Sequence, residues 1–326
     1  MTQGVLPIAV DAMGGDRAPH EIVAGAREAA AEGIPVVLVG PSDLADRGDL
    51  PLIPAEEVVA MDEDPAQAIR RKKDSTLVRA AEAVRDGKAA AMISAGNTGA
   101  TMAAALLRMG RIKGVSRPAI ATPIPVPGST PTVLLDAGAN AEVQPEWLVQ
   151  FAQMGSVFAK HRFALDAPRV GLLSIGEEPG KGDLLRKEAF GLLEVATGIE
   201  FIGNVEGRDV MGDRVDVVVT DGVTGNVVLK TLEGGVKAVV KALLAAFSID
   251  PETKAHADAL LPALLPLYET LDPDTYGGAI LLGVDGVCTI SHGSAGAKAL
   301  ANGIRVAQEM VEHRIVDEIR AAVAAG

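Results

Sequence analysis

Short runs of β-branched residues alternate with alanine-rich stretches along nearly the whole chain, and this alternation constrains the fold more than any other feature of the sequence. The short runs have the length and composition of buried strands. The longer stretches repeat apolar residues with the period of an amphipathic helix. Because strands that alternate with helices form a largely parallel sheet covered by helices, the sequence predicts an α/β fold.

The pattern also places the individual elements. We expect strands at residues 6–10, 36–39, 57–60, 90–94, 119–124, 132–135, 170–174, 200–202, 215–220, 279–282 and 287–290. We expect helices at residues 19–31, 76–86, 98–108, 145–161, 184–196, 225–246, 251–271 and 294–323.

The chain is expected to form a single α/β domain over residues 1–326, because neither a linker nor a repeat interrupts the alternation. The length alone would allow two domains, but α/β chains of this size often form one body. Residues 225–275 differ from the rest, since two long helical patterns follow each other there without a strand between them. We expect this segment to be a helical hairpin that projects from the α/β body.

Charge and cysteine content exclude several classes of protein. The chain has 30 basic and 43 acidic side chains, a net charge of −13, and an isoelectric point near 4.9. A nucleic-acid binder needs a basic surface, so none is expected as a partner. The single cysteine, Cys288, can form neither an internal disulfide nor a zinc site. With no export signal and no long apolar span, a cytoplasmic protein is expected.

Five predicted strands end in the same chemistry, a small polar residue followed by glycine and then an amide or a hydroxyl. Glycine lets backbone N–H groups approach an anion, and the helix that follows adds unpaired N–H groups and a favourable dipole. If the carboxyl ends of these strands face one crevice, the loops suit a phosphate or a developing oxyanion. The loops contain Asp11, Gly14, Gly15 and Asp16; Ser94, Gly96, Asn97, Thr98 and Gly99; Asp136 and Asn140; Ser174; and Asp221, Gly222, Thr224, Gly225 and Asn226.

Other catalytic signatures are missing from the sequence. No P-loop, dinucleotide fingerprint or G-x-S-x-G motif is present. Cys288 lies in an apolar run and is expected to be a buried core residue. The aspartates at the strand ends offer an alternative reading as Mg²⁺ ligands, although we expect no metal and no cofactor. His292 follows a strand and precedes a helix, so it is a candidate to face the crevice.

Seven short motifs in one order resemble the bacterial phosphate acyltransferases of fatty acid and phospholipid synthesis. The motifs are VDAMGGD at 10–16, ISAGNTGA at 93–100, DAGAN at 136–140, GNVEGR at 203–208, DGVTGN at 221–226, YGGA at 276–279 and HGS at 292–294. Two positions depart from the family pattern, since Ser174 stands where Asn is expected and Gln144 where Cys is usual.

The resemblance implies an enzyme that converts acyl-(acyl carrier protein) and inorganic phosphate into acyl phosphate and free carrier protein. Its product would supply a membrane-bound glycerol-3-phosphate acyltransferase. The resemblance also implies a homodimer with a three-layer α/β/α fold, like that of the isocitrate and isopropylmalate dehydrogenases. The motif at 203–208 adds Asn204 and Glu206 to the substrate-binding candidates.

Phosphate attack on an activated thioester requires positioning more than covalent catalysis. We therefore expect the 94–99 and 222–226 loops to bind phosphate and the carbonyl oxygen. Within this set Asn226 is the catalytic candidate. Lys181 and Lys230 are expected to supply positive charge, and His292 to relay a proton.

Two further surfaces are expected to bind partners. The basic run Arg70, Arg71, Lys72 and Lys73 stands out in an acidic chain and suits an acidic carrier protein. A second basic set is Arg108, Arg111, Lys113 and Arg117. The apolar stripe of the hairpin is expected to pack against a second copy or to touch a membrane surface, and it contains Leu260, Leu261, Leu264 and Leu265.

Three other functions remain open from the sequence. The first is a phosphotransacetylase that uses coenzyme A thioesters. The second is a non-catalytic scaffold for lipid enzymes, which would have no need for the polar glycine loops. The third is a decarboxylating dehydrogenase, since such enzymes share the implied fold.

Overall fold

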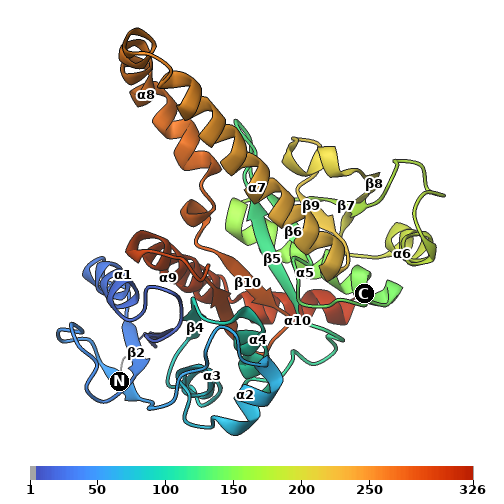
Figure 1. Ribbon diagram of the computed structural model, residues 1–326. Helices are drawn as coiled ribbons and strands as arrows, with labels where there is room; N and C mark the ends of the chain where they lie inside the picture. Colours follow the sequence, from blue (N-terminus) through green and yellow to red (C-terminus); the bar gives the residue numbers. More distant parts are fainter. Residues whose placement is uncertain (1–4, 326) are drawn as a thin grey trace.

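The computed structural model describes residues 5–325. One sheet of eleven strands runs through the molecule, and helices cover both faces of the sheet (Figure 1). The expected strands at 119–124, 132–135, 279–282 and 287–290 have the same bounds in the structure. In spatial order the strands are β3 (Leu52–Pro54), β2 (Val36–Gly40), β1 (Ile8–Asp11), β4 (Ala91–Ser94), β11 (Val287–Ile290), β10 (Ala279–Leu282), β5 (Ala119–Ile124), β6 (Thr132–Leu135), β9 (Val217–Val219), β7 (Arg169–Leu173) and β8 (Glu200–Val205).

Successive residues of each strand point to opposite faces, so the sheet has two apolar cores. On β1, Ile8 and Val10 belong to one core and Ala9 to the other. The first core contains α1 (His20–Ala31), α5 (Pro145–Phe163), α6 (Leu184–Val195), α9 (Ala297–Glu312) and α10 (Ile315–Ala325). The second contains α2 (Pro65–Arg71), α3 (Thr76–Arg85), α4 (Thr98–Arg108) and the 3₁₀ helix η1 (Gly207–Met211). The predicted layered α/β fold is confirmed.

The two halves of the sheet run in opposite directions. β10 is antiparallel to both β11 and β5, and β5 is antiparallel to β6. The remaining pairs are parallel. The carboxyl ends of β1, β4 and β11 therefore lie at the opposite end of the strands from the carboxyl ends of β6, β7, β8 and β9. The prediction that all five glycine loops leave the sheet at one end is therefore wrong.

Helices α7 (Gly222–Phe247) and α8 (Pro251–Leu271) project together from the body (Figure 1). Asp221 begins α7 by accepting a hydrogen bond from the N–H of Thr224 at 2.9 Å. Few side chains of the pair are buried, since α7 buries only Gly222 and Gly225 and α8 only Ala257. The 3₁₀ helix η2 (Pro273–Tyr276) returns the chain to the sheet.

Three predicted elements differ most from the structure. Residues 57–60 form no strand. The strand in this region is β3, which lies at the edge of the sheet, where prolines are tolerated. The prolines there weaken the sequence pattern by which a strand is predicted. The helix expected at 294–323 is two helices, because the chain turns at Arg314, whose φ is 52°. Strand β8 continues past 202 because Gly203 takes a φ of 97° beside a register shift against β7.

Candidate active site

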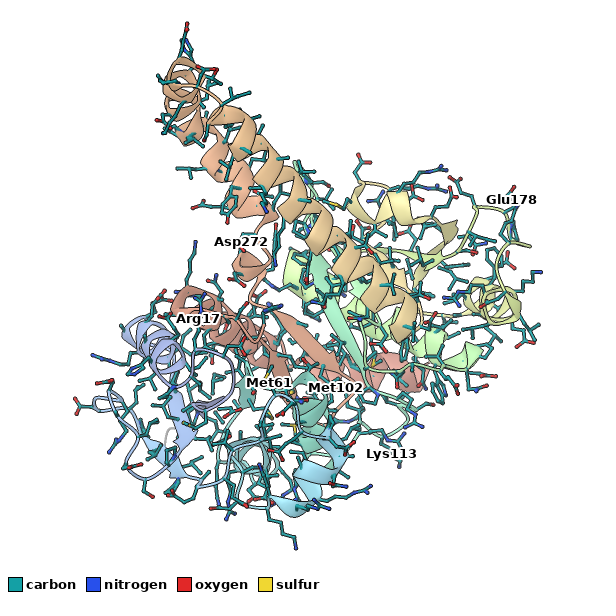
Figure 2. The ribbon with its side chains drawn as sticks, in the orientation of Figure 1. Arg17, Met61, Met102, Lys113, Glu178 and Asp272 are labelled. Atoms are coloured by element: carbon teal, nitrogen blue, oxygen red, sulfur yellow. The ribbon has the colours of Figure 1, made fainter. Side chains whose placement is uncertain are left out.

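A cavity of about 570 Å³ lies at the base of the hairpin, where α7 passes over the sheet. Figure 2 shows Asp272, one of its lining residues, at the point where the hairpin meets the body. Hydroxyl, amide and imidazole groups form one part of the lining, namely Thr98, Thr122, Asn226, Ser291, His292 and Ser294. Apolar side chains form much of the remainder, including Ile120, Pro123, Leu229, Val236, Val240, Leu244, Tyr268, Leu271 and Ile290. The cavity lining therefore combines hydrogen-bonding groups with apolar side chains.

Four of the predicted site residues line this cavity: Thr98, Asn226, Lys230 and His292. Thr98 begins α4, and His292 follows β11 at the same end of the sheet. The Nδ1 atom of His292 lies 2.8 Å from the hydroxyl of Ser294. The Nζ atom of Lys230 lies 2.9 Å from a carboxylate oxygen of Glu233 on the same helix.

Asp11 and Ser94 support the loop that carries Thr98 and do not face the cavity. Both are buried, and the Ser94 hydroxyl donates to Asp11 Oδ2 at 2.7 Å and accepts from the N–H of Gly96 at 2.9 Å. A Cβ atom on Gly14 would lie 2.5 Å from the same carboxylate oxygen, so only glycine fits above it. Burial raises the pKa of Asp11, against hydrogen bonds from Thr76 and Ser94 that favour the charged form. These residues set the shape of the loop.

Asp136 has a similar role beneath the start of α7. Its carboxylate accepts hydrogen bonds from the backbone of Ile120, Gly138, Ala139 and Asn140 at 2.7–3.1 Å. Burial is the main cause that raises the pKa of Asp136. A Cβ atom on Gly225 would lie 1.9 Å from the carbonyl oxygen of Asp136, so α7 can approach this loop only with glycine there.

An arginine from α6 fixes the first turn of α7. Arg186 forms an ion pair with Asp221, and its Nη2 atom also donates to the Thr224 hydroxyl at 3.1 Å. The side chains of Arg186 and Asp221 are only 12% and 10% exposed. Although burial opposes ionisation, hydrogen bonds from Thr224 and Arg186 hold the pKa of Asp221 below its usual value. Asp221 and Thr224 therefore hold α7 in place and do not contact the cavity.

Lys181, Asn204 and Glu206 lie away from the cavity. They follow β7 and β8, the last two strands at one edge of the sheet, whereas Asn226 follows β9, which lies closer to the centre. Lys181 pairs with Glu178 at 3.9 Å, and Figure 2 shows Glu178 on the far side of the molecule from Asp272. Asn204 donates to the carbonyl of Glu178 at 2.8 Å, and Glu206 pairs with Arg208. The geometry gives these three residues no contact with the cavity described above.

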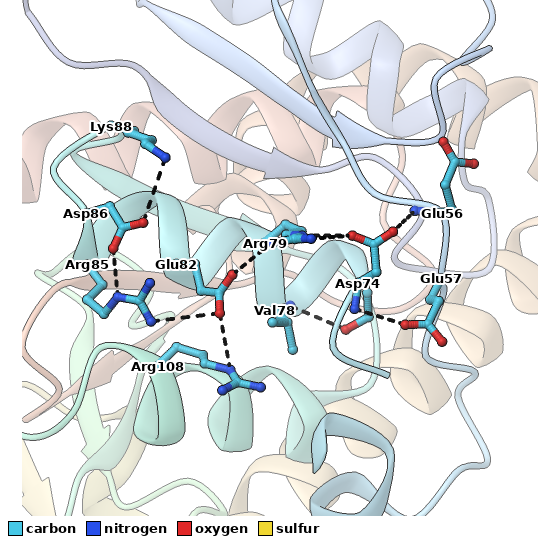
Figure 3. Close-up of polar contacts among 11 residues, drawn as sticks. Glu56, Glu57, Asp74, Val78, Arg79, Glu82, Arg85, Asp86, Lys88 and Arg108 are labelled. Atoms are coloured by element: carbon cyan, nitrogen blue, oxygen red, sulfur yellow. Dashed lines mark hydrogen bonds and ion pairs between the residues drawn. The ribbon is translucent and has the colours of Figure 1, made fainter. Parts of the chain in front are cut away.

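The predicted docking residues lie on the surface of the body. Arg70, Arg71 and Lys73 are exposed at the end of α2, whereas Lys72 pairs with Glu63 and donates to the carbonyl of Val58 at 2.6 Å. Much of the second basic set is already engaged. Arg108 lies 3.8 Å from Glu82 (Figure 3), Arg111 binds the carbonyl of Ser116, and Arg117 lies 5.1 Å above the Trp147 ring.

Leu260, Leu261, Leu264 and Leu265 lie within α8, and Leu260 and Leu265 are more than half exposed. The turn of the hairpin is at residues 248–250, which places these leucines along the side of the hairpin and not at its end.

Several cavity residues were not predicted from the sequence. Lys237 and Lys241 follow Lys230 on the same face of α7, and Asp272 and Asp274 stand near η2. The spacing of 226, 230, 233, 237 and 241 is a helical repeat that would have been visible in the sequence. A repeat of this kind on a long exposed helix is usually only its solvated face.

Other candidate chemistry is limited among residues 5–325. The described part of the chain holds no group of three or more metal-ligating side chains. Cys288 is fully buried, and desolvation raises the pKa of its thiol to about 12, which removes it as a nucleophile. No helix between residues 5 and 325 is long and apolar enough to span a membrane.

Solved structures share this arrangement of sheet and helices. A phosphotransacetylase from Streptococcus pyogenes is 16% identical, with a TM-score of 0.62 over 95% of this chain and 94% of that chain. The EutD phosphotransacetylase from Staphylococcus aureus, also 16% identical, has a TM-score of 0.60 over 94% of each chain. The protein thus has the fold of the phosphotransacetylases.

Sequence similarity is much closer to one family. The family described as "Fatty acid synthesis protein" matches residues 6–318. Phosphate acyltransferase of Pelotomaculum thermopropionicum is 48% identical over 98% of this chain and 95% of the relative, and that of Desulfitobacterium hafniense (strain Y51) is 48% identical over 97% of each. The chain belongs to this phosphate acyltransferase family, which confirms the predicted family and the prediction of a transferase.

Proposed function

We propose that this enzyme transfers an acyl group from an acyl-(acyl carrier protein) thioester to inorganic phosphate, yielding acyl phosphate for phospholipid synthesis. The observation that carries the proposal is the cavity, whose lining is divided between hydrogen-bond donors and the apolar side chains of α7 and α8. A thioester of a fatty acid has the same division, with a reactive polar group at the end of an apolar chain. A membrane-bound glycerol-3-phosphate acyltransferase is the proposed consumer of the product.

In the proposed reaction a phosphate oxygen attacks the thioester carbonyl carbon. A C–O bond forms, the carbonyl oxygen becomes an oxyanion, and collapse of this intermediate breaks the C–S bond and leaves the electron pair on sulfur. Thr98, Asn226 and the backbone N–H groups near them are the donors for phosphate and oxyanion. Lys230 adds positive charge, and His292 transfers the phosphate proton toward the departing thiolate.

The direct test is acyl phosphate formation from acyl-(acyl carrier protein), trapped with hydroxylamine, with phosphate omitted as the control. Phosphate-dependent product from the carrier-linked donor supports the proposal. Product from acyl-coenzyme A alone would instead indicate a phosphotransacetylase, and no product from either donor would contradict both.

The basic end of α2 is the proposed docking site for the acidic carrier protein. Helix α2 packs closely against the start of α4, as shown by the 2.7 Å that would separate a Cβ atom on Gly99 from Pro65. Since Thr98 at the start of α4 lines the cavity, the exposed Arg70 and Arg71 belong to an element next to the cavity. We expect Arg70→Glu/Arg71→Glu to raise KM for the carrier-linked donor about tenfold, because complementary charge steers the encounter. KM for phosphate should not change.

Steady-state kinetics with each substrate varied would check this prediction. Lys88→Glu/Lys254→Glu is the matched control, since both lysines are exposed and neither lines the cavity. An unchanged KM for the carrier-linked donor in the α2 variant would remove α2 as the docking site.

The apolar side of the hairpin is the proposed contact with a second copy of the chain and with a membrane surface. Val239 is 68%, Leu260 59% and Leu265 56% exposed, and exposed apolar side chains that form one patch mark interaction surfaces. We expect Leu260→Ser/Leu265→Ser to reduce flotation with liposomes severalfold or to shift the sedimentation coefficient toward the monomer. If flotation and sedimentation both match the wild type, these leucines contact neither partner.

A further inference from the structure

Three lysines form a row on the face of α7 that lines the cavity. Lys230, Lys237 and Lys241 are separated by seven and four residues, so the helix places all three on one side. Lys230 is paired with Glu233, but within residues 5–325 neither Lys237 nor Lys241 makes an ion pair. Two ammonium groups without an ion-pair partner among residues 5–325 therefore face the cavity, in a protein whose net charge is −13.

The distance between these lysines and Asn226 limits what they can bind together. Lys237 and Lys241 follow Asn226 by 11 and 15 residues on α7, which at the rise of a helix is about 16 and about 22 Å. Any ligand that reaches both regions must carry an anionic group at roughly this distance from its reacting atom. Inorganic phosphate and the thioester carbonyl are both too small to do so.

The prosthetic arm of a carrier protein is close in length to the nearer of these two distances. About 13 bonds separate the sulfur of a phosphopantetheine arm from its phosphorus, and an extended chain of that length spans about 15 Å. The arm also carries a dimethyl group between two amides and the phosphate. Val236 and Val240 lie beside the lysines on the same wall and supply an apolar contact for that group.

The other side of the cavity does not suit an anion. Asp272 and Asp274 line it near η2. Burial and, less strongly, Asp272 raise the pKa of Asp274, whereas His292, Arg17 and Lys237 favour its charged form. Of these two sides of the cavity, only α7 therefore offers positive charge to a phosphate group.

We propose that Lys237 and Lys241 form a subsite for the phosphodiester of a phosphopantetheine arm whose thioester lies at Asn226. This inference rests on the proposed function, because it describes the donor of the same acyl transfer. Lysine binds phosphate as a flexible point charge, so the subsite would anchor the arm without fixing one orientation.

The test compares two small thioesters with the same acyl group, an acyl-pantetheine and an acyl-4′-phosphopantetheine. We expect the wild type to prefer the phosphorylated donor about tenfold in kcat/KM. Lys237→Ala/Lys241→Ala should lose this preference, with activity on acyl-pantetheine and KM for inorganic phosphate unchanged. Lys254→Ala is the control, because it removes one positive charge from the hairpin outside the cavity.

Equal use of the two donors by the wild type, or an equal loss with both donors in the double variant, would overturn the subsite. Calorimetric binding of 4′-phosphopantetheine itself tests the subsite without turnover. If it binds the wild type and not the double variant while no thioester yields acyl phosphate, the proposed reaction fails and the subsite stands. If the double variant keeps this binding but loses affinity for vesicles of anionic phospholipid, the lysines bind lipid headgroups and the proposal is wrong.

Discussion

Replacing Asn226 by alanine is expected to lower kcat for phosphate-dependent acyl transfer about 100-fold or more, because loss of one donor to an oxyanion typically has this effect. Asn226 lies in the second turn of α7 and lines the cavity. It stands beside Gly138, where a Cβ atom would lie 3.6 Å from the Asn226 amide oxygen. Since the side chain is exposed to the cavity, its loss should leave the fold intact.

Two further variants separate the chemistry of Asn226 from its shape. Asn226→Asp keeps the size of the side chain but removes its N–H donors, so it should be as impaired as the alanine variant. Val227→Ala changes the next residue, which is 59% exposed and lies outside the cavity, and should keep wild-type kcat. Single-turnover rates and thermal unfolding of all three would check the prediction. Near-normal turnover of Asn226→Ala would exclude it as an oxyanion donor.

The sequence predicts the elements of this fold better than their directions. Strands such as β5, β6, β10 and β11 have the expected bounds because each is a buried run of apolar residues between turn residues. Periodicity shows which residues of a strand are buried, but strand direction depends on pairing with residues far away in the chain. The antiparallel position of β10 reverses half of the sheet, and the strand order places β7 and β8, with Lys181 and Asn204, at the edge away from the cavity.

The candidate site was predictable where glycine loops meet helix starts, as at Thr98 and Asn226. It was not predictable where function depends on which way a helix faces. Lys237 and Lys241 resemble solvated lysines in the sequence, and only the path of α7 across the sheet places them at the cavity. Asp11 and Asp136 were expected to bind ligand because they end strands, but their oxygens are used to hold neighbouring loops.

Arg186 is the residue whose loss we expect to destabilise the fold most. The ion pair between Arg186 and Asp221 is nearly buried, and Arg186 also donates to Thr220 and Thr224. Arg186→Ala would leave the Asp221 carboxylate buried without its partner, which typically costs about 3–5 kcal/mol of unfolding free energy. Because Asp221 caps α7, the same change should also displace Asn226 and lower activity. Urea unfolding and activity would measure both effects.

Two comparison variants check this prediction. Arg208→Ala removes the partner of Glu206, but Arg208 is 72% exposed, so its effect should be below about 1 kcal/mol. Asp221→Asn/Arg186→Met removes both charges and should be milder than Arg186→Ala, since no unpaired charge remains. A double variant as unstable as Arg186→Ala would contradict the buried-charge explanation.

The pH dependence of the unfolding free energy provides an independent test of the interaction between Arg186 and Asp221. In the wild type the pKa of Asp221 is lowered, although burial opposes this, because Thr224 and Arg186 favour the charged form. Its contribution to stability is therefore complete above the unfolded pKa of about 4 and is lost as the pH falls through the lower folded pKa. Without Arg186, burial dominates and the folded pKa rises. Asp221 then destabilises the ionised protein, and the unfolding free energy should increase as the pH falls through the raised folded pKa toward the unfolded pKa of about 4, opposite to the wild-type contribution. Urea unfolding of wild type and Arg186→Ala between about pH 4 and pH 7 would show this difference, and parallel pH profiles would mean that Arg186 does not control the ionisation of Asp221.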